Sequence, residues 1–214
     1  MNFLDYLSSR WDNLLELGIE HALVTIVAVL IATVIGVGLG TATYTRPRSR
    51  QLVIAATSVF LTIPSLALFG LFINVFGIGT TSVLVALVMY SLLPIVANTV
   101  VGLREVDPAV VESAQGMGMG RVQRLLRIEL PLAWPVILTG MRVSTLVTLG
   151  ITALGAYIQG PGLGNDIFAG LSRLSSPNAI NLVLGGTLGV VVLAVLFDLF
   201  YVLLNRLTTA RGIR

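Results

Sequence analysis

The chain has 214 residues, of which 56% are hydrophobic and 11% charged, with a formal net charge of +3 and a mean hydropathy of +0.95. Ordinary soluble domains carry roughly 25% charged residues, so this composition excludes a soluble protein and predicts an all-α membrane protein. There is no cysteine and only one histidine, His21, which excludes disulfides and leaves no expected metal site. All 13 basic residues are arginine. Without lysine the chain cannot be a conventional P-loop ATPase.

The length allows about four to six spans of around 20 residues, so residues 1–214 are expected to form a single membrane domain. Residues 1–20 carry apolar side chains at helical spacing, which predicts a short helix lying in the membrane interface. We expect a five-span core over residues 21–205. The apolar positions of the N-terminal helix are Phe3, Leu4, Leu7, Trp11, Leu14 and Leu15.

The first span is expected over residues 22–45, which carry no charge and measure about 36 Å as a helix. The uncharged run from Gln51 to Leu103 measures roughly 80 Å, which is too long for one crossing. It therefore predicts a hairpin of two spans, with a turn near residues 74–82, where glycines and small polar residues interrupt the apolar run.

Two prolines, Pro64 and Pro94, lie inside the second and third spans. Proline removes a backbone hydrogen bond and kinks helices, so both residues are candidates for a bend that lines or gates a pathway. Membrane helices also tolerate proline where neighbouring groups satisfy the backbone, and the sequence leaves these alternatives open.

The fourth span is expected from Pro131 to about Tyr157, and the fifth from about Ile180 to Leu204. Five spans place the two termini on opposite sides, and arginine is enriched on the cytoplasmic side. This rule predicts an external N-terminus and a cytoplasmic C-terminus. Ten arginines then share the cytoplasmic face: Arg46, Arg48, Arg50, Arg104, Arg121, Arg124, Arg127, Arg206, Arg211 and Arg214.

Two charged residues, Arg142 and Asp198, lie within the fourth and fifth spans. Intramembrane charges are costly and rarely face lipid, so we expect them to be buried. They are candidates for a buried ion pair that stabilises the helix bundle. A role in a pathway or proton relay is the alternative.

Asp107 to Pro131 form a polar segment between the third and fourth spans. Asp107 followed by Pro108 is a typical helix start, and the glycines of residues 116–120 can end that helix or admit a close neighbour. A second short helix is expected over residues 121–130, before Pro131 marks entry into the membrane. Four arginines balance four acids from Arg104 to Glu129, which favours docking to a protein groove over binding of anionic lipid.

The spacing of residues in this segment resembles the EAA signature of permease subunits of type I ABC importers. Ser113 replaces the usual second residue of the triplet. The resemblance implies that residues 107–130, hereafter the coupling segment, form a cytoplasmic coupling helix that sits in a groove of an ATP-binding subunit. The matching positions are Glu112, Ser113, Ala114, Gly118, Ile128, Leu130 and Pro131.

A wider resemblance links most of the chain to permeases for osmoprotectants such as glycine betaine, carnitine, choline or proline betaine. It rests on TIPSLALFGLF, FGIGT, YSLLPIVANTVVGLREVDP, ESAQGMGM and GAYIQGPGLG. It implies a type I importer permease fold in the cytoplasmic (inner) membrane, with ATPase subunits that use ATP and Mg. A second permease copy or paralogue and an extracytoplasmic solute-binding protein complete the expected partners, besides membrane lipid.

Other functions remain open on the residues alone. The transported solute can be another small molecule, such as an amino acid, and no substrate-binding residue can be named. A secondary transporter that needs no ATPase, or a membrane scaffold that moves nothing, are alternatives of a different class. No catalytic residue, bound cofactor or nucleic-acid partner is expected for this chain.

Overall fold

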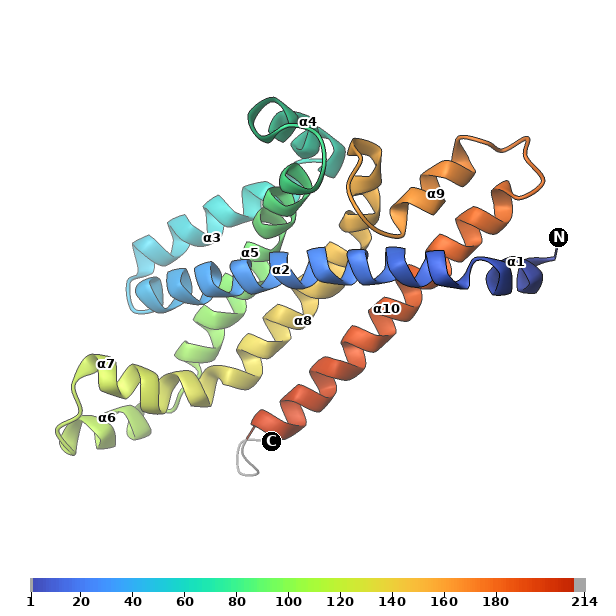
Figure 1. Ribbon diagram of the computed structural model, residues 1–214. Coiled ribbons are helices and arrows are strands. Elements are labelled where there is room, and N and C mark those ends of the chain that lie inside the picture. Colours follow the sequence, from blue (N-terminus) through green and yellow to red (C-terminus); the bar gives the residue numbers. More distant parts are fainter. Residues whose placement is uncertain (1, 210–214) are drawn as a thin grey trace.

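The computed structural model describes residues 2–209, which contain helices and no strand. Long helices cross one another as an elongated bundle, with short helices at its two ends (Figure 1). In chain order the elements are α1 (Phe3–Ser9), α2 (Trp11–Thr43), α3 (Pro47–Thr62), α4 (Ser65–Phe76), α5 (Thr80–Arg104), α6 (Pro108–Gly116), α7 (Arg121–Arg124), the π-helix η1 (Leu125–Glu129), α8 (Leu130–Gly155), the 3₁₀ helix η2 (Ala156–Ile158), α9 (Gly164–Leu171) and α10 (Ala179–Thr208).

The helix expected over residues 1–20 is divided in the structure. Asn2 caps the short α1 by accepting a 2.8 Å hydrogen bond from the amide of Asp5. Arg10 then interrupts the helix with a non-helical backbone (φ −119°, ψ 15°). Trp11 begins α2, whose 33 residues measure about 50 Å. This exceeds the roughly 30 Å hydrocarbon core, so α2 contains both the second half of the expected N-terminal helix and the first span.

The second expected span is a bent pair rather than one straight helix. Its two parts, α3 and α4, meet at an angle of 99°. Pro64 lies at the break, where an extended Ile63 ends α3. The Tyr90 hydroxyl of α5 donates a 2.6 Å hydrogen bond to the Ile63 carbonyl, which satisfies a group left free by the break. Pro94, by contrast, lies inside an uninterrupted α5.

Close packing of α2, α5 and α8 forms the centre of the bundle. Gly40 of α2 faces α5, where an added Cβ would lie 2.6 Å from Thr99 Cγ2. Gly140 of α8 faces the same helix, where an added Cβ would lie 2.7 Å from the Pro94 carbonyl. Small residues at these positions let the backbones approach, as in many membrane helix pairs. Gly36 and Gly40 of the first span therefore pack within the chain, whereas Gly38 has no neighbour within 4 Å of an added Cβ.

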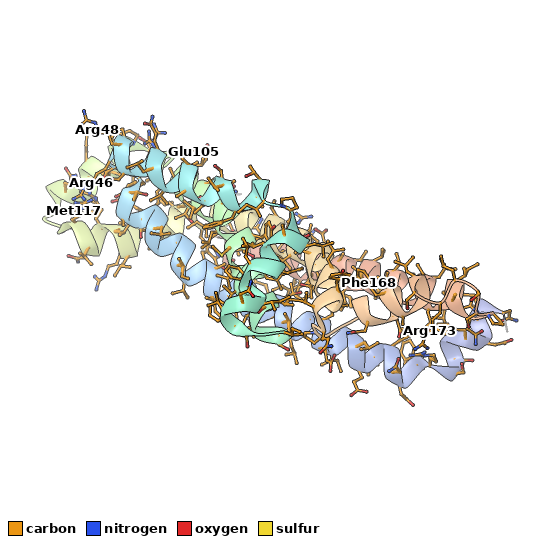
Figure 2. All side chains as sticks on the ribbon, turned by 90° about the horizontal axis from the view of Figure 1, so that it is seen from above. Arg46, Arg48, Glu105, Met117, Phe168 and Arg173 are labelled. Carbon is orange, nitrogen blue, oxygen red and sulfur yellow. The ribbon has the colours of Figure 1, made fainter. Side chains whose placement is uncertain are left out.

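Four helices among residues 2–209 are long and apolar enough to cross a membrane, and the bent pair makes five if it counts as one span. The expected all-α architecture of about five spans agrees with this arrangement. Figure 2 shows Arg46, Arg48 and Met117 at one end of the molecule and Arg173 towards the other, with Phe168 between them on the side of Arg173. Arg211 and Arg214, which the topology prediction also used, lie outside the described residues.

Candidate functional site

The coupling segment begins with a capped helix at the arginine-rich end of the bundle (α6, Figure 1). The Asp107 side chain accepts a 2.8 Å hydrogen bond from the amide of Ala109, and Pro108 occupies the first helical turn. An N-cap acceptor satisfies one of the amides that a helix start leaves free. The predicted helix start is therefore confirmed.

A glycine-dependent turn ends α6. The Gly118 amide donates to the Gln115 carbonyl at 2.9 Å, and the Met119 amide donates to the Ala114 carbonyl at 3.1 Å. These two bonds define a Schellman motif, in which the residue after the helix adopts a left-handed conformation. Gly118 does so with φ +81°, and an added Cβ would meet nothing within 4 Å. The glycine is therefore needed for backbone conformation and not for close packing.

The second half of the segment differs from the separate short helix expected before Pro131. Residues 121–158 form one continuous helical stretch, so α7 and η1 lead directly into the fourth span. Within η1 the Leu130 amide donates to the carbonyl of Leu125, five residues back. This π turn changes the hydrogen-bond register just before Pro131, which cannot donate the next bond, and the helix continues past it.

The signature positions divide into exposed and inward-facing groups. Glu112 and Ser113 are exposed on α6, and Ser113 Oγ donates to the Ala109 carbonyl at 2.7 Å. Ala114 is buried on the opposite side. Leu130 is half-buried and packs against the main hydrophobic core, which anchors the segment to the bundle. Ile128 is half-buried, whereas Gly118 and Pro131 are exposed.

Large apolar side chains project from the segment into solvent. Met117 is 70% exposed, Val122 69% and Leu126 59%, whereas Leu125 is half-buried against the core. Charged residues of the same segment, including Glu112, are also exposed. An exposed apolar group rimmed by polar residues is typical of a protein docking surface.

A buried carboxylate links the segment to the first span. Glu129 is 2% exposed. Its Oε2 accepts a 2.6 Å hydrogen bond from the Tyr44 hydroxyl, and its Oε1 pairs with Arg124 Nε at 2.6 Å. Nearby, an Arg121 nitrogen donates to Thr45 Oγ1 at 3.3 Å. Tyr44, Arg124 and Glu129 are hereafter the Glu129 clamp.

The two intramembrane charges form the expected ion pair, with Arg142 and Asp198 2.6 Å apart. The pair is not buried, however, because its side chains are 41% and 34% exposed. It joins the outer surfaces of α8 and α10, so it neutralises charge at the surface of the single chain instead of inside the bundle. The expectation of full burial is wrong for the chain on its own.

The opposite end of the molecule carries a second polar cluster around α9. Asp166 is buried and pairs with Arg10 at 3.1 Å, while the Tyr6 hydroxyl donates to it at 3.3 Å. Burial raises the pKa of Tyr6, the Asp166 carboxylate raises this pKa further, and Arg10 lowers it. These contacts fasten α1 and the start of α2 to α9.

The glycine-rich loop before α9 is also fastened to α2. The Gly162 amide donates to Glu20 Oε2 at 3.2 Å. An added Cβ on Gly162 would lie 2.8 Å from His21 Cβ. His21 is fully buried and its Nε2 lies 3.0 Å from the Leu149 carbonyl, so it is a packed interior residue.

Comparison with known families decides the class of protein. Residues 21–209 match the family described as binding-protein-dependent transport system inner membrane component. The chain belongs to this family. It is therefore a multi-pass inner-membrane transport permease, and the match includes the whole coupling segment.

Relatives of this permease have similar length. The choline transport system permease protein OpuBB of Bacillus subtilis is 34% identical over 213 residues, which cover 100% of this chain and 96% of that protein. The glycine betaine/carnitine/choline transport system permease protein OpuCD of the same organism is 36% identical, covering 91% and 83%. The osmoprotectant import permease protein OsmW of Salmonella typhimurium is 35% identical, covering 100% of both.

A solved structure supports the fold assignment. The inward-facing MetNI methionine ABC transporter contains a chain that superimposes on this permease with a TM-score of 0.79 at 22% identity. The overlap covers 92% of this permease and 96% of that chain. The expected type I ABC importer permease fold is therefore confirmed.

Sequence reasoning missed the Glu129 clamp. Glu129 occupies the free position between Ile128 and Leu130 in the signature, so the motif gives it no role. Arg124 and Glu129 are five residues apart, a spacing that does not bring side chains together on an α-helix. The ion pair between Arg124 and Glu129 forms because the π turn of η1 brings the two side chains together.

Proposed function

We propose that this permease is the transmembrane subunit of an ATP-driven importer for small osmoprotectants such as glycine betaine, carnitine, choline or proline betaine. Relatives named for these solutes match nearly the whole chain, which supports the substrate class. The observation that carries the transport role is the exposed coupling segment, in which a capped helix and a Schellman turn present Glu112 and Met117 outward.

The proposed assembly contains two permease subunits, identical or paralogous, and two ATPase subunits that bind ATP and Mg. A solute-binding protein docks on the opposite side, near α9. The N-terminus lies outside and the C-terminus lies in the cytoplasm. Figure 2 supports this orientation because Arg46, Arg48 and Met117 share one end, and arginine is enriched on the cytoplasmic side.

In this assembly the coupling segment receives mechanical work from the ATPase subunits. ATP-driven closure of the ATPase pair draws two coupling segments together, and the spans turn from inward-open to outward-open. ATP shifts this equilibrium only by as much as it favours one conformation over the other. Moving the equilibrium from 1:99 to 99:1 requires about 5.5 kcal/mol, which ATP binding at two sites must supply through the two segments.

The class is tested by purifying the tagged permease from its native membrane and identifying the proteins that accompany it. An ATPase with a P-loop and a solute-binding protein support the proposal. Ligand binding to that solute-binding protein is then measured with glycine betaine, carnitine, choline and proline betaine, and with methionine as the amino-acid alternative. Tight binding of methionine alone would replace the osmoprotectant assignment with an amino-acid importer.

Reconstitution in liposomes separates this function from a secondary transporter. Uptake should require ATP inside liposomes that contain the ATPase, and it should continue when an uncoupler removes the proton gradient. Uptake that follows the gradient without an ATPase refutes the proposal.

Orientation is tested with single cysteines, because the natural chain has none. Met117→Cys and Arg173→Cys lie at opposite ends of the molecule (Figure 2). A membrane-impermeant maleimide should label the second variant in intact cells, and label the first only after the membrane is opened. The reverse pattern would overturn the assignment of sides.

A further inference from the structure

A buried ionic contact at the base of the coupling segment suggests how displacement reaches the first span. Both carboxylate oxygens of Glu129 are used, one by Tyr44 and one by Arg124, each at 2.6 Å. Tyr44 is distant in sequence from the other two residues, which lie five positions apart in the helical stretch of residues 121–158. Tyr44 directly follows α2, Arg124 ends α7, and Glu129 ends η1.

The π turn is what makes this contact possible. In an α-helix with 3.6 residues per turn, side chains five positions apart point about 140° away from each other. Bonding between residues five apart widens the turn and brings such side chains to one side. Arg124 and Glu129 are related in this way, and the Leu130 amide bonds the Leu125 carbonyl across the same turn.

Stability alone does not account for the clamp. Removing a carboxylate from water costs several kcal/mol, and well-packed apolar residues often replace a buried ion pair without loss of stability. Glu129 lies beside apolar core residues such as Leu125 and Leu130, so an apolar side chain would suit this site. The ionic contact instead fixes one orientation of the turn relative to Tyr44.

We propose that the Glu129 clamp is a rigid strut that transmits motion of the coupling segment to α2 and to the following turn. Arg121 reinforces the strut through its hydrogen bond to Thr45, the residue next to Tyr44. The clamp stays closed throughout the transport cycle, so α2 moves together with the start of α8. Glu129 is thus a positioning residue for coupling, and this inference rests on the proposed import function.

Breaking the clamp should separate ATP hydrolysis from transport. In Glu129→Gln the amide still accepts from Tyr44 but loses its charge against Arg124. We expect the ATPase to remain bound and active in reconstituted liposomes, while solute uptake per ATP hydrolysed falls by about tenfold, the scale of one charge-assisted hydrogen bond. The matched control is Glu105→Gln, which removes an exposed carboxylate at the same end of the molecule (Figure 2). Glu105→Gln should keep the same solute uptake per ATP hydrolysed as the natural chain.

A covalent replacement tests the strut itself. The double variant Tyr44→Cys/Glu129→Cys lacks the clamp. Because the natural chain has no cysteine, a short cleavable bismaleimide, added to the purified permease before its partners, can join these two positions. Uptake per ATP should be low before crosslinking, recover after it, and fall again when the linker is cleaved. A residue needed only for folding would show no such reversible recovery.

The outcomes separate this inference from the proposed function. If the natural chain, reconstituted with its ATPase, its second permease subunit and its solute-binding protein, moves no solute, the import proposal fails. If the natural chain transports but Glu129→Gln keeps the natural ratio, only the strut is refuted. The strut is also refuted if crosslinking does not restore uptake per ATP hydrolysed in the double variant. That result would mean that the clamp must open during the cycle, which the crosslink prevents.

Discussion

Replacing Gly118 by alanine should weaken the docking of the coupling segment while leaving the bundle folded. Gly118 has φ +81°, and an added Cβ would find open space in the chain. The penalty therefore comes from backbone conformation alone, because an L-residue with a side chain rarely adopts this region. The turn also fixes where the exposed Met117 points relative to α7.

The size of the effect follows from the left-handed conformation. Holding alanine there costs about 1–2 kcal/mol, which lowers the ratio of the correct turn to other conformations by about 5–30-fold. The apparent affinity for the ATPase should fall by up to this factor, since only the correct turn binds. Asparagine tolerates this conformation better, so Gly118→Asn should lie between alanine and the natural residue.

The matched control is Gly116→Ala, two residues earlier in the same segment. Gly116 is helical and its added Cβ also meets nothing within 4 Å. Alanine there should stabilise α6 by about 0.5–1 kcal/mol and preserve ATPase binding. Binding is measured with detergent-purified permease and ATPase, and folding by monodispersity and thermal unfolding. Equal affinities for the natural chain and Gly118→Ala, or equal losses in both alanine variants, would refute the conformational argument.

Three further tests concern the packing of the bundle. Gly140→Ala should destabilise the protein by about 1–3 kcal/mol because its Cβ would press on a carbonyl of α5, whereas Gly150→Ala, with no neighbour within 4 Å, should be neutral in thermal unfolding. Reversing either charge of the Arg142–Asp198 pair should lower the unfolding temperature, and the double exchange Arg142→Asp/Asp198→Arg should restore it; no recovery would show that the pair is not in contact. Tyr90→Phe should cost about 1 kcal/mol by freeing the carbonyl at the bend between α3 and α4.

Much of the membrane architecture could be predicted because spans leave a strong signal in composition. Uncharged runs of sufficient length gave the first span and the hairpin, and the turn expected over residues 74–82 contains the observed break at residues 77–79. Asp107 and Pro108 marked a helix start because capping depends on a few local atoms. Local chemistry and hydrophobic length thus determine these elements.

Features that depend on tertiary contacts were less predictable. The uncharged run indicated two crossings, but it gave no sign that α3 and α4 meet at 99°. Proline permits such a bend without requiring it, as Pro94 in the continuous α5 demonstrates. The difference lies in the surroundings of Pro64, where the Tyr90 hydroxyl from another helix satisfies a backbone carbonyl at the break. A partner far along the chain, and not the proline itself, stabilises the bend.

Glu129 shows why a sequence signature can include the residues that shape a docking segment and still omit those that attach the segment to the spans. The signature positions on α6 shape the exposed surface, where Glu112 projects outward and Gly118 forms the turn. Such a surface transmits force only if its base is fixed to the spans. Leu130 of the signature packs on the core, but the ionic groups that fix the base lie in gaps of the signature or outside it. The π turn that unites Arg124 with Glu129 has no periodicity visible in the sequence. Docking shape and ionic attachment therefore depend on different residues, and substitutions at Gly118 and Glu129 should separate them: the first weakens ATPase binding, and the second preserves binding while reducing uptake per ATP.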